Sequence, residues 1–422
     1  MKKFLTIWTG ELISSIGSGM TAFALAVYVF QMTGSVSYVS LVTLLAYMPT
    51  ILLSPIGGVL ADRYDRRLLM IIGDLCSGLG LAYILWQIQF GSFKMFPILA
   101  GVTFNAVFVA LLEPSYKATV TDLLTEEEFA KASGMVQIAG NAKYLISPAL
   151  AGLLLGITDI RLILLIDICT VVVTVLTTSI VRNTISKPVI KEGRGFIIEM
   201  KDGLSIIKGN QRVVALIVIM ALVCFFVGFV QTLAGPMLLA ITDAKTVGIV
   251  ESVCAVGMLV GSLWIGLVGI HKNYSTILCV AGIFCGLFVA LAGVNRNLIF
   301  TAGSIFLFFV TLPFINTCAD VLVRVSIPNE VQGRVWGIIS LLTQSGMVLA
   351  YILCGVLSDY IFEPMLAEGG LLADSVGRII GSGEGRGIGF LLILSGIGMI
   401  IAILTTGRNK VGGVHVSEIV EK

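Results

Sequence analysis

Charged residues are scarce in this sequence. They make up 12% of its 422 residues, whereas a soluble globular domain carries about 25%. Hydrophobic residues make up 57% of the chain, and the mean hydropathy is +1.02. This composition excludes a soluble domain, and it predicts that most of the chain lies in a lipid bilayer.

Residues and motifs for catalysis or metal binding are also missing. The sequence has two histidines and eight cysteines, none of which forms a CxxC pair. It contains no HExxH, Walker or GxSxG motif, so we expect neither an enzyme nor a metal site or cofactor. The cysteines all fall inside apolar runs, where small buried packing residues are expected rather than disulfides.

Long apolar runs are what the sequence has instead. A transmembrane helix needs about 20 mostly apolar residues, and continuous runs rich in Leu, Ile and Gly favour helices over barrel strands. Twelve such runs predict an all-α polytopic membrane protein with two pseudo-symmetric six-helix bundles. The predicted spans are residues 5–30, 38–61, 68–90, 96–114, 132–157, 161–181, 213–233, 247–270, 275–294, 298–321, 335–361 and 387–406.

The distribution of Lys and Arg predicts how these spans are oriented. With the N-terminus inside, the inner connections hold 20 of the 27 basic residues and the outer connections hold six. Basic residues collect on the cytoplasmic side of membrane proteins. We therefore expect a multi-pass protein of the cell membrane with both termini in the cytoplasm.

The longest inner connection divides the spans six and six. Apolar residues at helical spacing within it predict an amphipathic helix on the inner membrane surface. An offset of 203 residues pairs Gly58 with Gly261, among other identities, and suggests that the halves are repeats. The predicted segments are an N-terminal bundle over 1–181, a linker over 182–212, a C-terminal bundle over 213–406 and a tail over 407–422.

The connection between predicted spans 2 and 3 carries the clearest motif, Gly58-Val-Leu-Ala-Asp62-Arg63-Tyr-Asp65-Arg66-Arg67. It resembles the loop signature of the major facilitator superfamily, in which a glycine stands where Asp65 stands here. Asp tolerates the left-handed backbone that glycine adopts, so we expect the turn to be kept. The resemblance implies transport by alternating access between two bundles, without a cofactor, a metal or nucleic acid.

The same resemblance implies that the charged loop is a gate. An aspartate at position 62 would meet the partial positive charge at the start of span 11 and close the inner side. A purely topological anchor is the alternative, but an anchor does not account for the aspartates. The expected gating residues are Gly58, Asp62, Arg63, Arg66 and Arg67, with Asp74, Glu113 or Asp122 as acidic partners of the arginines.

Further similarities point to the macrolide-efflux-like branch of the superfamily. They are the loop followed by Asp74, the segment Ile146-Ser147-Pro148-Ala149, and Ile166-Asp167. The branch implies a bacterial, monomeric exporter of small hydrophobic drugs such as macrolides, driven by protons. Span 5 also resembles the glycine-proline motif of drug/proton antiporters, because Gly134, Pro148 and Gly152 are kept. Lys143, Ser147 and Ala151 depart from that motif, although Ser147 and Ala151 are small enough for close helix packing.

Ionisable residues inside the spans cost roughly 2.5–3.5 kcal/mol each at mid-span, so each one needs a reason. Glu11 could carry a proton or pair with a basic neighbour. Lys143 could pair with Glu11 or bind an anionic group of the substrate. Asp74 is expected to pair with Arg67, with proton or substrate coupling as the alternative. Two further coupling candidates, which could instead be exposed at the outer interface, are Asp167 and Glu251.

Uncharged side chains could line a central cavity. The polar candidates come from four spans, and two phenylalanines could stack on an apolar ligand or face lipid instead. These candidates are Gln31, Asn105, Gln231, Gln344, Phe225 and Phe229. Two alternatives to drug export stay open at this point: an exporter of an endogenous product, such as a siderophore, peptide or lysolipid, and a membrane sensor or scaffold that transports nothing.

Overall fold

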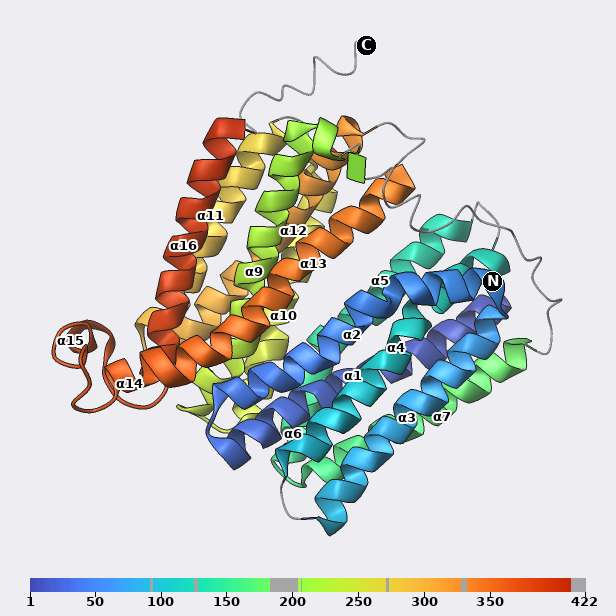
Figure 1. The fold of residues 1–422 in the computed structure, drawn as a ribbon, viewed down its shortest axis with the longest axis horizontal. Helices are drawn as coiled ribbons and strands as arrows, with labels where there is room; N and C mark the ends of the chain where they lie inside the picture. Colours follow the sequence, from blue (N-terminus) through green and yellow to red (C-terminus); the bar gives the residue numbers. More distant parts are fainter. Residues whose placement is uncertain are drawn as a thin grey trace. The chain divides into compact units, whose positions relative to one another are not determined.

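The computed structural model describes residues 1–91, 94–124, 128–182, 204–205, 207–270, 273–327 and 332–410. Over these ranges the chain is helical and has no strand (Figure 1). Twelve of the described helices, counting interrupted ones once, are long and apolar enough to cross a membrane. The predicted all-α fold with twelve spans is confirmed.

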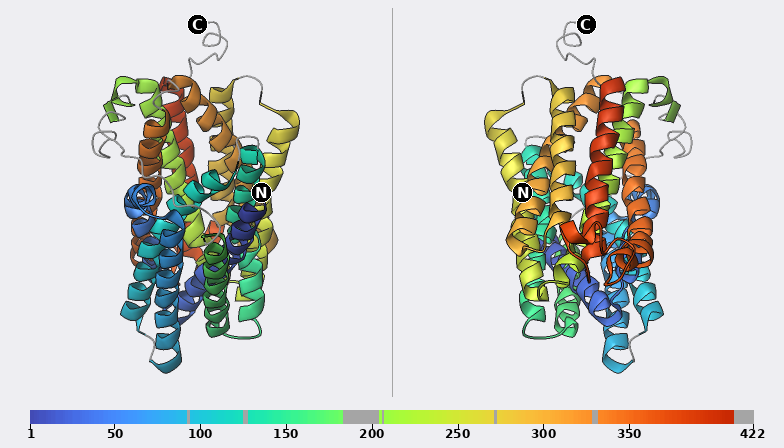
Figure 2. Two further views of the ribbon diagram at one scale, coloured as in Figure 1. Left: turned by 90° about the vertical axis from the view of Figure 1, so that its right-hand side faces the viewer. Right: turned by 90° about the vertical axis from the view of Figure 1, so that its left-hand side faces the viewer.

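Contacts between helices divide the chain into two compact units, and in each of them the helices run side by side (Figure 2). The first unit comprises Met1–Gly193 together with Thr242–Ser252, and the second comprises Arg194–Ile241 together with Val253–Lys422. The helices of residues 1–182 are α1 (Lys2–Thr33), α2 (Val36–Arg63), α3 (Arg66–Phe90), α4 (Met95–Leu123), α5 (Phe129–Leu145), α6 (Ser147–Leu155) and α7 (Ile160–Arg182).

The later helices begin after the linker. They are α9 (Gln211–Leu239), α10 (Ala244–Val268), α11 (Tyr274–Val294), α12 (Leu298–Ser326), α13 (Gln332–Leu357), the π-helical turn η3 (Ser358–Phe362), α14 (Glu363–Leu366), α15 (Gly377–Ile380) and α16 (Arg386–Lys410). The last two short helices and the turns around them lie in the predicted outer connection. The predicted amphipathic helix and the tail fall largely outside the described residues.

Small residues let the helices of the first unit approach closely. A Cβ atom added to Gly10 would meet the hydroxyl of Thr177, and one added to Gly17 would lie 2.6 Å from Oγ1 of Thr170. Both glycines are on α1 and both threonines are on α7. Lipid tails are as apolar as the side chains they touch, so the close van der Waals contact that these glycines permit is what holds the helices together.

The second unit uses the same device. A Cβ atom added to Gly286 of α11 would lie 2.7 Å from the carbonyl oxygen of Gly396 in α16. One added to Gly228 of α9 would lie 2.7 Å from Cβ of Ala350 in α13. The backbones in these helix pairs therefore pack with no room for a larger side chain.

Span 5 differs from its prediction, because the helix expected over residues 132–157 is interrupted. It consists of α5 and α6, which meet at Ile146. Pro148 is the second residue of α6. Proline lacks a backbone N–H, and its ring clashes with the carbonyl four residues earlier, so an α-helix ends or bends just before it. The break falls beside Lys143, one of the predicted ionisable residues.

Candidate functional site

The turn between α2 and α3 is built differently from the predicted one. Asp65 has φ −62° and ψ 108°, and its carboxylate accepts a hydrogen bond from the backbone N–H of Arg67 at 3.1 Å. It is therefore the N-cap of α3, a position at which Asp is strongly preferred. The prediction of a left-handed residue here is wrong, because an extended N-cap residue makes the turn without one.

The arginines that follow converge on α4. Nη1 of Arg66 lies 2.6 Å from Oδ1 of Asp122, and Nη2 of Arg67 lies 3.7 Å from Oδ2 of the same carboxylate. Arg66 also donates to the carbonyl of Ala61 at 3.0 Å. Two cations on one carboxylate, with Arg67 only 3% exposed, clamp the end of α2, the start of α3 and the end of α4 together.

The other two acids proposed for the arginines lie elsewhere. Glu113 pairs with Lys117, one turn along α4, at 2.6 Å. Asp74 is 6% exposed, and within the described residues it forms no ion pair with Arg67 or any other cation. The pairing expected between Asp74 and Arg67 is therefore wrong, because the arginine extends towards Asp122 instead.

Asp65 makes one further contact that sequence reasoning missed. Its Oδ2 atom accepts a hydrogen bond from Nε of Arg182, the last residue of α7, at 2.8 Å. Burial acts to raise the pKa of this carboxyl. The hydrogen bonds from Arg182 and Arg67 and the charge of Arg182 outweigh burial, so the pKa lies below its usual value. The loop is thereby joined to the end of span 6.

The remaining loop residues are placed as follows. Arg63 is the exposed last residue of α2. Asp62 lies in the last turn of α2 and its side chain is outside the described residues, so its contact with span 11 stays a prediction. A Cβ atom on Gly58 would meet no described atom within 4 Å, whereas one on Gly57 would lie 2.7 Å from the carbonyl of Ala110.

Gly57 and Gly261 pack against a proline in the same way, each within its own half of the predicted repeat. A Cβ atom on Gly57 would lie 3.3 Å from Cγ of Pro114 in α4, and one on Gly261 would lie 3.2 Å from Cγ of Pro313 in α12. Gly57 is thus the packing counterpart of Gly261. The two glycines are separated by 204 residues, one more than the offset of 203 found in the sequence.

Two acids of the first unit act on each other electrostatically. Glu11 of α1 lies within electrostatic reach of Asp74 of α3 and of Tyr116 of α4. The Tyr116 hydroxyl is buried and has no hydrogen-bond partner among the described residues. Glu11 therefore faces an acid and a phenol, and Lys143, its proposed partner, acts on a different carboxylate.

That carboxylate is Asp167 of α7, which is 1% exposed. Lys143 of α5 lies within electrostatic reach of it. Three hydroxyl groups surround Asp167, from Ser18 and Thr21 of α1 and from Thr170 one turn along α7. The spacing of Asp167 and Thr170 places both on one helix face and could have indicated the pair. Nothing in the sequence pointed to the α1 hydroxyls.

The antiporter-like motif packs against the first turns of α10. A Cβ atom on Gly152 would lie 2.7 Å from the carbonyl of Ala244, and Gly248 lies against the carbonyl of Pro148. The hydroxyl of Ser252 accepts the N–H of Ala149 at 2.9 Å. Ser147 faces the other way and donates to the carbonyl of Ile16 in α1 at 2.9 Å. Gly134 lies in α5, and Glu251 is half-buried in α10.

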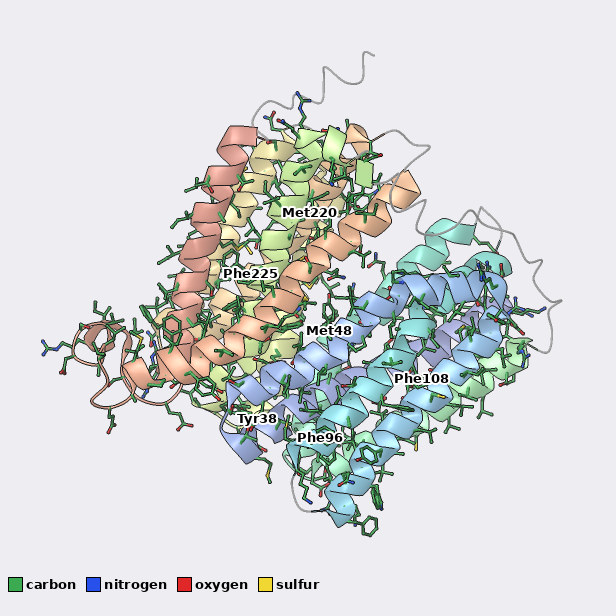
Figure 3. All side chains as sticks on the ribbon, in the orientation of Figure 1. Tyr38, Met48, Phe96, Phe108, Met220 and Phe225 are labelled. Atoms are coloured by element: carbon green, nitrogen blue, oxygen red, sulfur yellow. The ribbon has the colours of Figure 1, made fainter. Side chains whose placement is uncertain are left out.

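The predicted cavity-lining residues come from both units, so their grouping in a central cavity stays a prediction. Phe229 is only 3% exposed within its bundle, whereas Phe225 is half-buried on α9 (Figure 3). Asn105 donates to the carbonyl of Ser77 at 3.1 Å and so joins α4 to α3. The remaining candidates are Gln31, which is exposed, Gln344, which is half-buried, and Gln231, which is exposed and accepts the Tyr351 hydroxyl at 3.0 Å.

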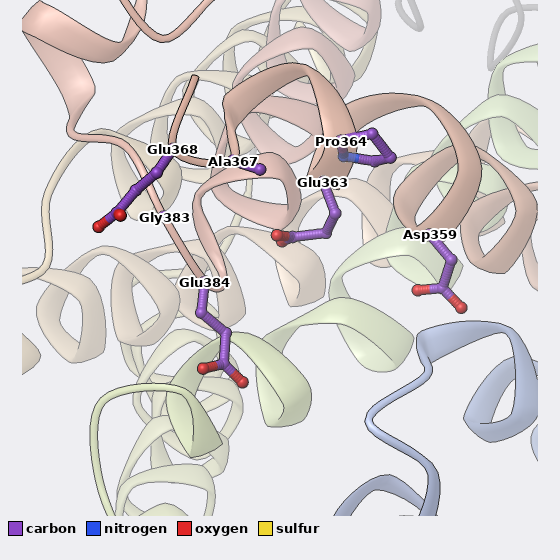
Figure 4. Close-up of a pocket in the computed structure, with 7 residues that line it drawn as sticks. All are labelled: Asp359, Glu363, Pro364, Ala367, Glu368, Gly383 and Glu384. Carbon is purple, nitrogen blue, oxygen red and sulfur yellow. The ribbon is translucent and has the colours of Figure 1, made fainter. Parts of the chain in front are cut away.

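A cavity of about 480 Å³ opens in the second unit, in the segment from η3 to the start of α16 (Figure 4). Its lining includes the carboxylates Asp359, Glu363, Glu368 and Glu384. Glu363 is held in place by the N–H of Ile388, which donates to it at 3.1 Å. The described residues contain no cluster of His, Cys, Asp and Glu suited to a metal ion.

Twelve helices that are long and apolar enough to cross a membrane are typical of a multi-pass membrane protein. The family model of the Major Facilitator Superfamily matches residues 7–351, and the chain belongs to this superfamily.

The chain is similar to bacterial exporters of known name and to solved transporter structures. Macrolide efflux protein A of Streptococcus pyogenes is 26% identical over 369 residues, which cover 85% of this chain and 90% of the relative. An enterobactin exporter of Shigella flexneri is 24% identical over 153 residues, 36% of this chain and 37% of the relative. Among solved structures, the nucleoside transporter NupG matches with a TM-score of 0.74 at 13% identity, covering 97% of this chain and all of the other.

Proposed function

We propose that this transporter exports small hydrophobic, macrolide-like drugs from a bacterial cell in exchange for protons, by alternating access. The observation that carries the proposal is the similarity to macrolide efflux protein A along 85% of the chain. Charged groups at the inner ends of the spans and acids inside them are what a gated, proton-driven carrier requires. The protein acts as a monomer with both termini in the cytoplasm.

The amount of drug that accumulates in cells tests this proposal. The chain is expressed in a macrolide-sensitive bacterium, and accumulation of labelled erythromycin is measured with and without a protonophore. Expression lowers accumulation several-fold, and the protonophore abolishes the difference. The control is Asp62→Asn, which removes the charge of the proposed gate and reaches the membrane at the wild-type level but exports much less drug. Accumulation equal to that of the empty vector would overturn the proposal.

An endogenous product is a second candidate cargo, because the chain is also similar to an enterobactin exporter. That relative matches over only a third of its length, so it supports a siderophore-like endogenous product less strongly than drug export. The discriminating measurement is the amount of siderophore released in iron-poor medium by a strain that lacks its own exporter. Restored release together with unchanged erythromycin accumulation would favour the endogenous cargo.

A further inference from the structure

Asp167 lies in a shell of hydroxyl groups that can serve either protonation state. Ser18 Oγ is 3.5 Å and Thr170 Oγ1 is 3.3 Å from Oδ1 of Asp167. The Thr21 hydroxyl is buried, faces the same carboxylate and has no partner of hydrogen-bonding length among the described residues. A hydroxyl has one proton to donate and two lone pairs to accept, so this shell can meet both a carboxylate and a carboxylic acid.

Thr170 favours the acid in this arrangement. Its hydroxyl also lies 2.7 Å from the backbone carbonyl of Asp167, and this shorter contact takes the single hydroxyl proton. The lone pairs of Thr170 are then free to accept a proton from Oδ1. A protonated Asp167 can therefore donate a hydrogen bond to the Thr170 hydroxyl. An ionised Asp167 cannot, and the Thr170 proton is already used by the backbone carbonyl.

Lys143 is the charge that acts on Asp167. The helices packed against α7 are α1, α3 and α6. The acids of α1 and α3 lie further along α7: Asp74 of α3 faces Thr174, and α1 reaches Thr177 at Gly10, next to Glu11. Thr174 is two turns beyond Asp167. Lys143 acts on Asp167 electrostatically, but within the described residues the two form no ion pair. An ionised carboxylate this deeply buried is unfavourable unless a cation approaches it.

Glycines place α1 against the carboxylate of Asp167 and against the backbone of Lys143. A Cβ atom on Gly17 would lie 2.9 Å from Oδ1 of Asp167, and one on Gly19 would lie 2.7 Å from the carbonyl of Lys143. Ser18, between them, is exposed at the surface of the unit while its hydroxyl reaches Asp167. Ser18 thus contributes the exposed hydroxyl of this shell, whereas Thr21 and Thr170 are buried.

We propose that Asp167 binds and releases the proton that drives transport, and that Lys143 neutralises the carboxylate once the proton has left. Only an O–H bond at Asp167 is made and broken, and the proton is exchanged with water through Ser18. The proton and the Lys143 ammonium group compete for one carboxylate. The role of Asp167 in driving transport rests on the proposed function, whereas proton binding at Asp167 does not.

Infrared difference spectroscopy of the purified full chain in lipid nanodiscs tests the proton site without any drug. The carbonyl stretch of a protonated carboxylic acid is followed as the pH is raised. In the wild type a band of this kind disappears over a defined pH range. The band is absent in Asp167→Asn, and it is kept in the matched control Asp74→Asn, which removes another buried acid of the same unit.

Lys143→Gln gives a second measurement in which the carboxyl is kept. Without the competing ammonium group, the midpoint of the Asp167 band shifts to higher pH. This variant decides the matter if Asp167→Asn elutes as aggregate in size-exclusion chromatography. An unchanged band in a folded Asp167→Asn protein, or an unchanged midpoint in Lys143→Gln, would overturn the assignment.

Erythromycin transport in proteoliposomes separates this inference from the proposed function. Proton-driven export that persists in Asp167→Asn overturns the role of Asp167 and leaves the drug function standing. An Asp167 band that titrates as described, in a wild type that moves no erythromycin, overturns the cargo and supports the proton site.

Discussion

Asp65 makes the turn between α2 and α3 without the left-handed backbone conformation that was expected at this position of the motif. It caps α3 through the N–H of Arg67 and binds Arg182 at 2.8 Å. The turn could be predicted from the sequence, but its geometry could not. An Asp at this position is compatible both with a left-handed turn residue and with a helix N-cap. The partner could not be predicted either, since Arg182 is 117 residues away.

Replacing Asp65 is expected to lower stability in a pH-dependent way. Asp65→Ala removes the cap, which costs about 0.5–2 kcal/mol, and also the pair with Arg182. The pKa of Asp65 is lowered in the folded protein, so its contribution is present above the ordinary Asp value of about 3.9 and is lost as the pH falls through the lower folded value. Thermal unfolding in detergent at several pH values measures this.

The matched control for that change is Asp65→Asn. Asn caps a helix as well as Asp does, so this variant keeps the hydrogen bond to Arg67 and loses the charge opposite Arg182. An intermediate melting temperature is expected at neutral pH. A melting temperature for Asp65→Ala equal to that of the wild type at neutral pH would show that neither contact matters.

The break between α5 and α6 is the element that sequence periodicity did not find. The apolar run over residues 132–157 is continuous, and its length was read correctly as a span. The interruption depends on Pro148 and on the contacts that receive it, namely Ser252 from α10 and the α1 backbone. Periodicity reports which residues are apolar, whereas a helix break depends on where backbone groups find partners.

Two glycines in this span give a matched pair of substitutions. A Cβ atom at Gly152 would lie 2.7 Å from the carbonyl of Ala244, while one at Gly140 would meet no described atom within 4 Å. In a helix interior Ala is favoured over Gly by about 1 kcal/mol. Gly140→Ala is therefore expected to be neutral or stabilising, and Gly152→Ala to be destabilising.

The melting temperatures of the two purified variants in detergent check this expectation. The same substitution is made on both sides of the break, so differences in helix propensity cancel. Equal melting temperatures would show that α6 can move away from the start of α10 without loss of stability.

The whole molecule was the easiest scale to predict. Each span carries its own length and apolar composition, so twelve of them could be counted without any knowledge of contacts. The constellation around Asp167 could not be predicted as a whole, because the α1 hydroxyls that complete it are more than a hundred positions away in the sequence. The family was predicted from the charged loop together with the twelve spans and the long central connection.

The orientation in the membrane rests on the basic residues alone. The 20 to 6 division predicts that both termini are cytoplasmic. A green fluorescent protein fused to the C-terminus is expected to fluoresce, and an alkaline phosphatase fused there is expected to be inactive. Active phosphatase at the C-terminus would reverse the assignment of inner and outer faces.

The pair formed by Asp65 and Arg182 has a consequence for how these two positions can change over time. A glycine at position 65 needs no partner on α7, whereas a partly buried aspartate there is stabilised by one. Substitution at either position therefore alters the cost of substitution at the other. Among related transporters, an acidic residue in the turn should occur together with a basic residue at the end of span 6, and the two should be lost together.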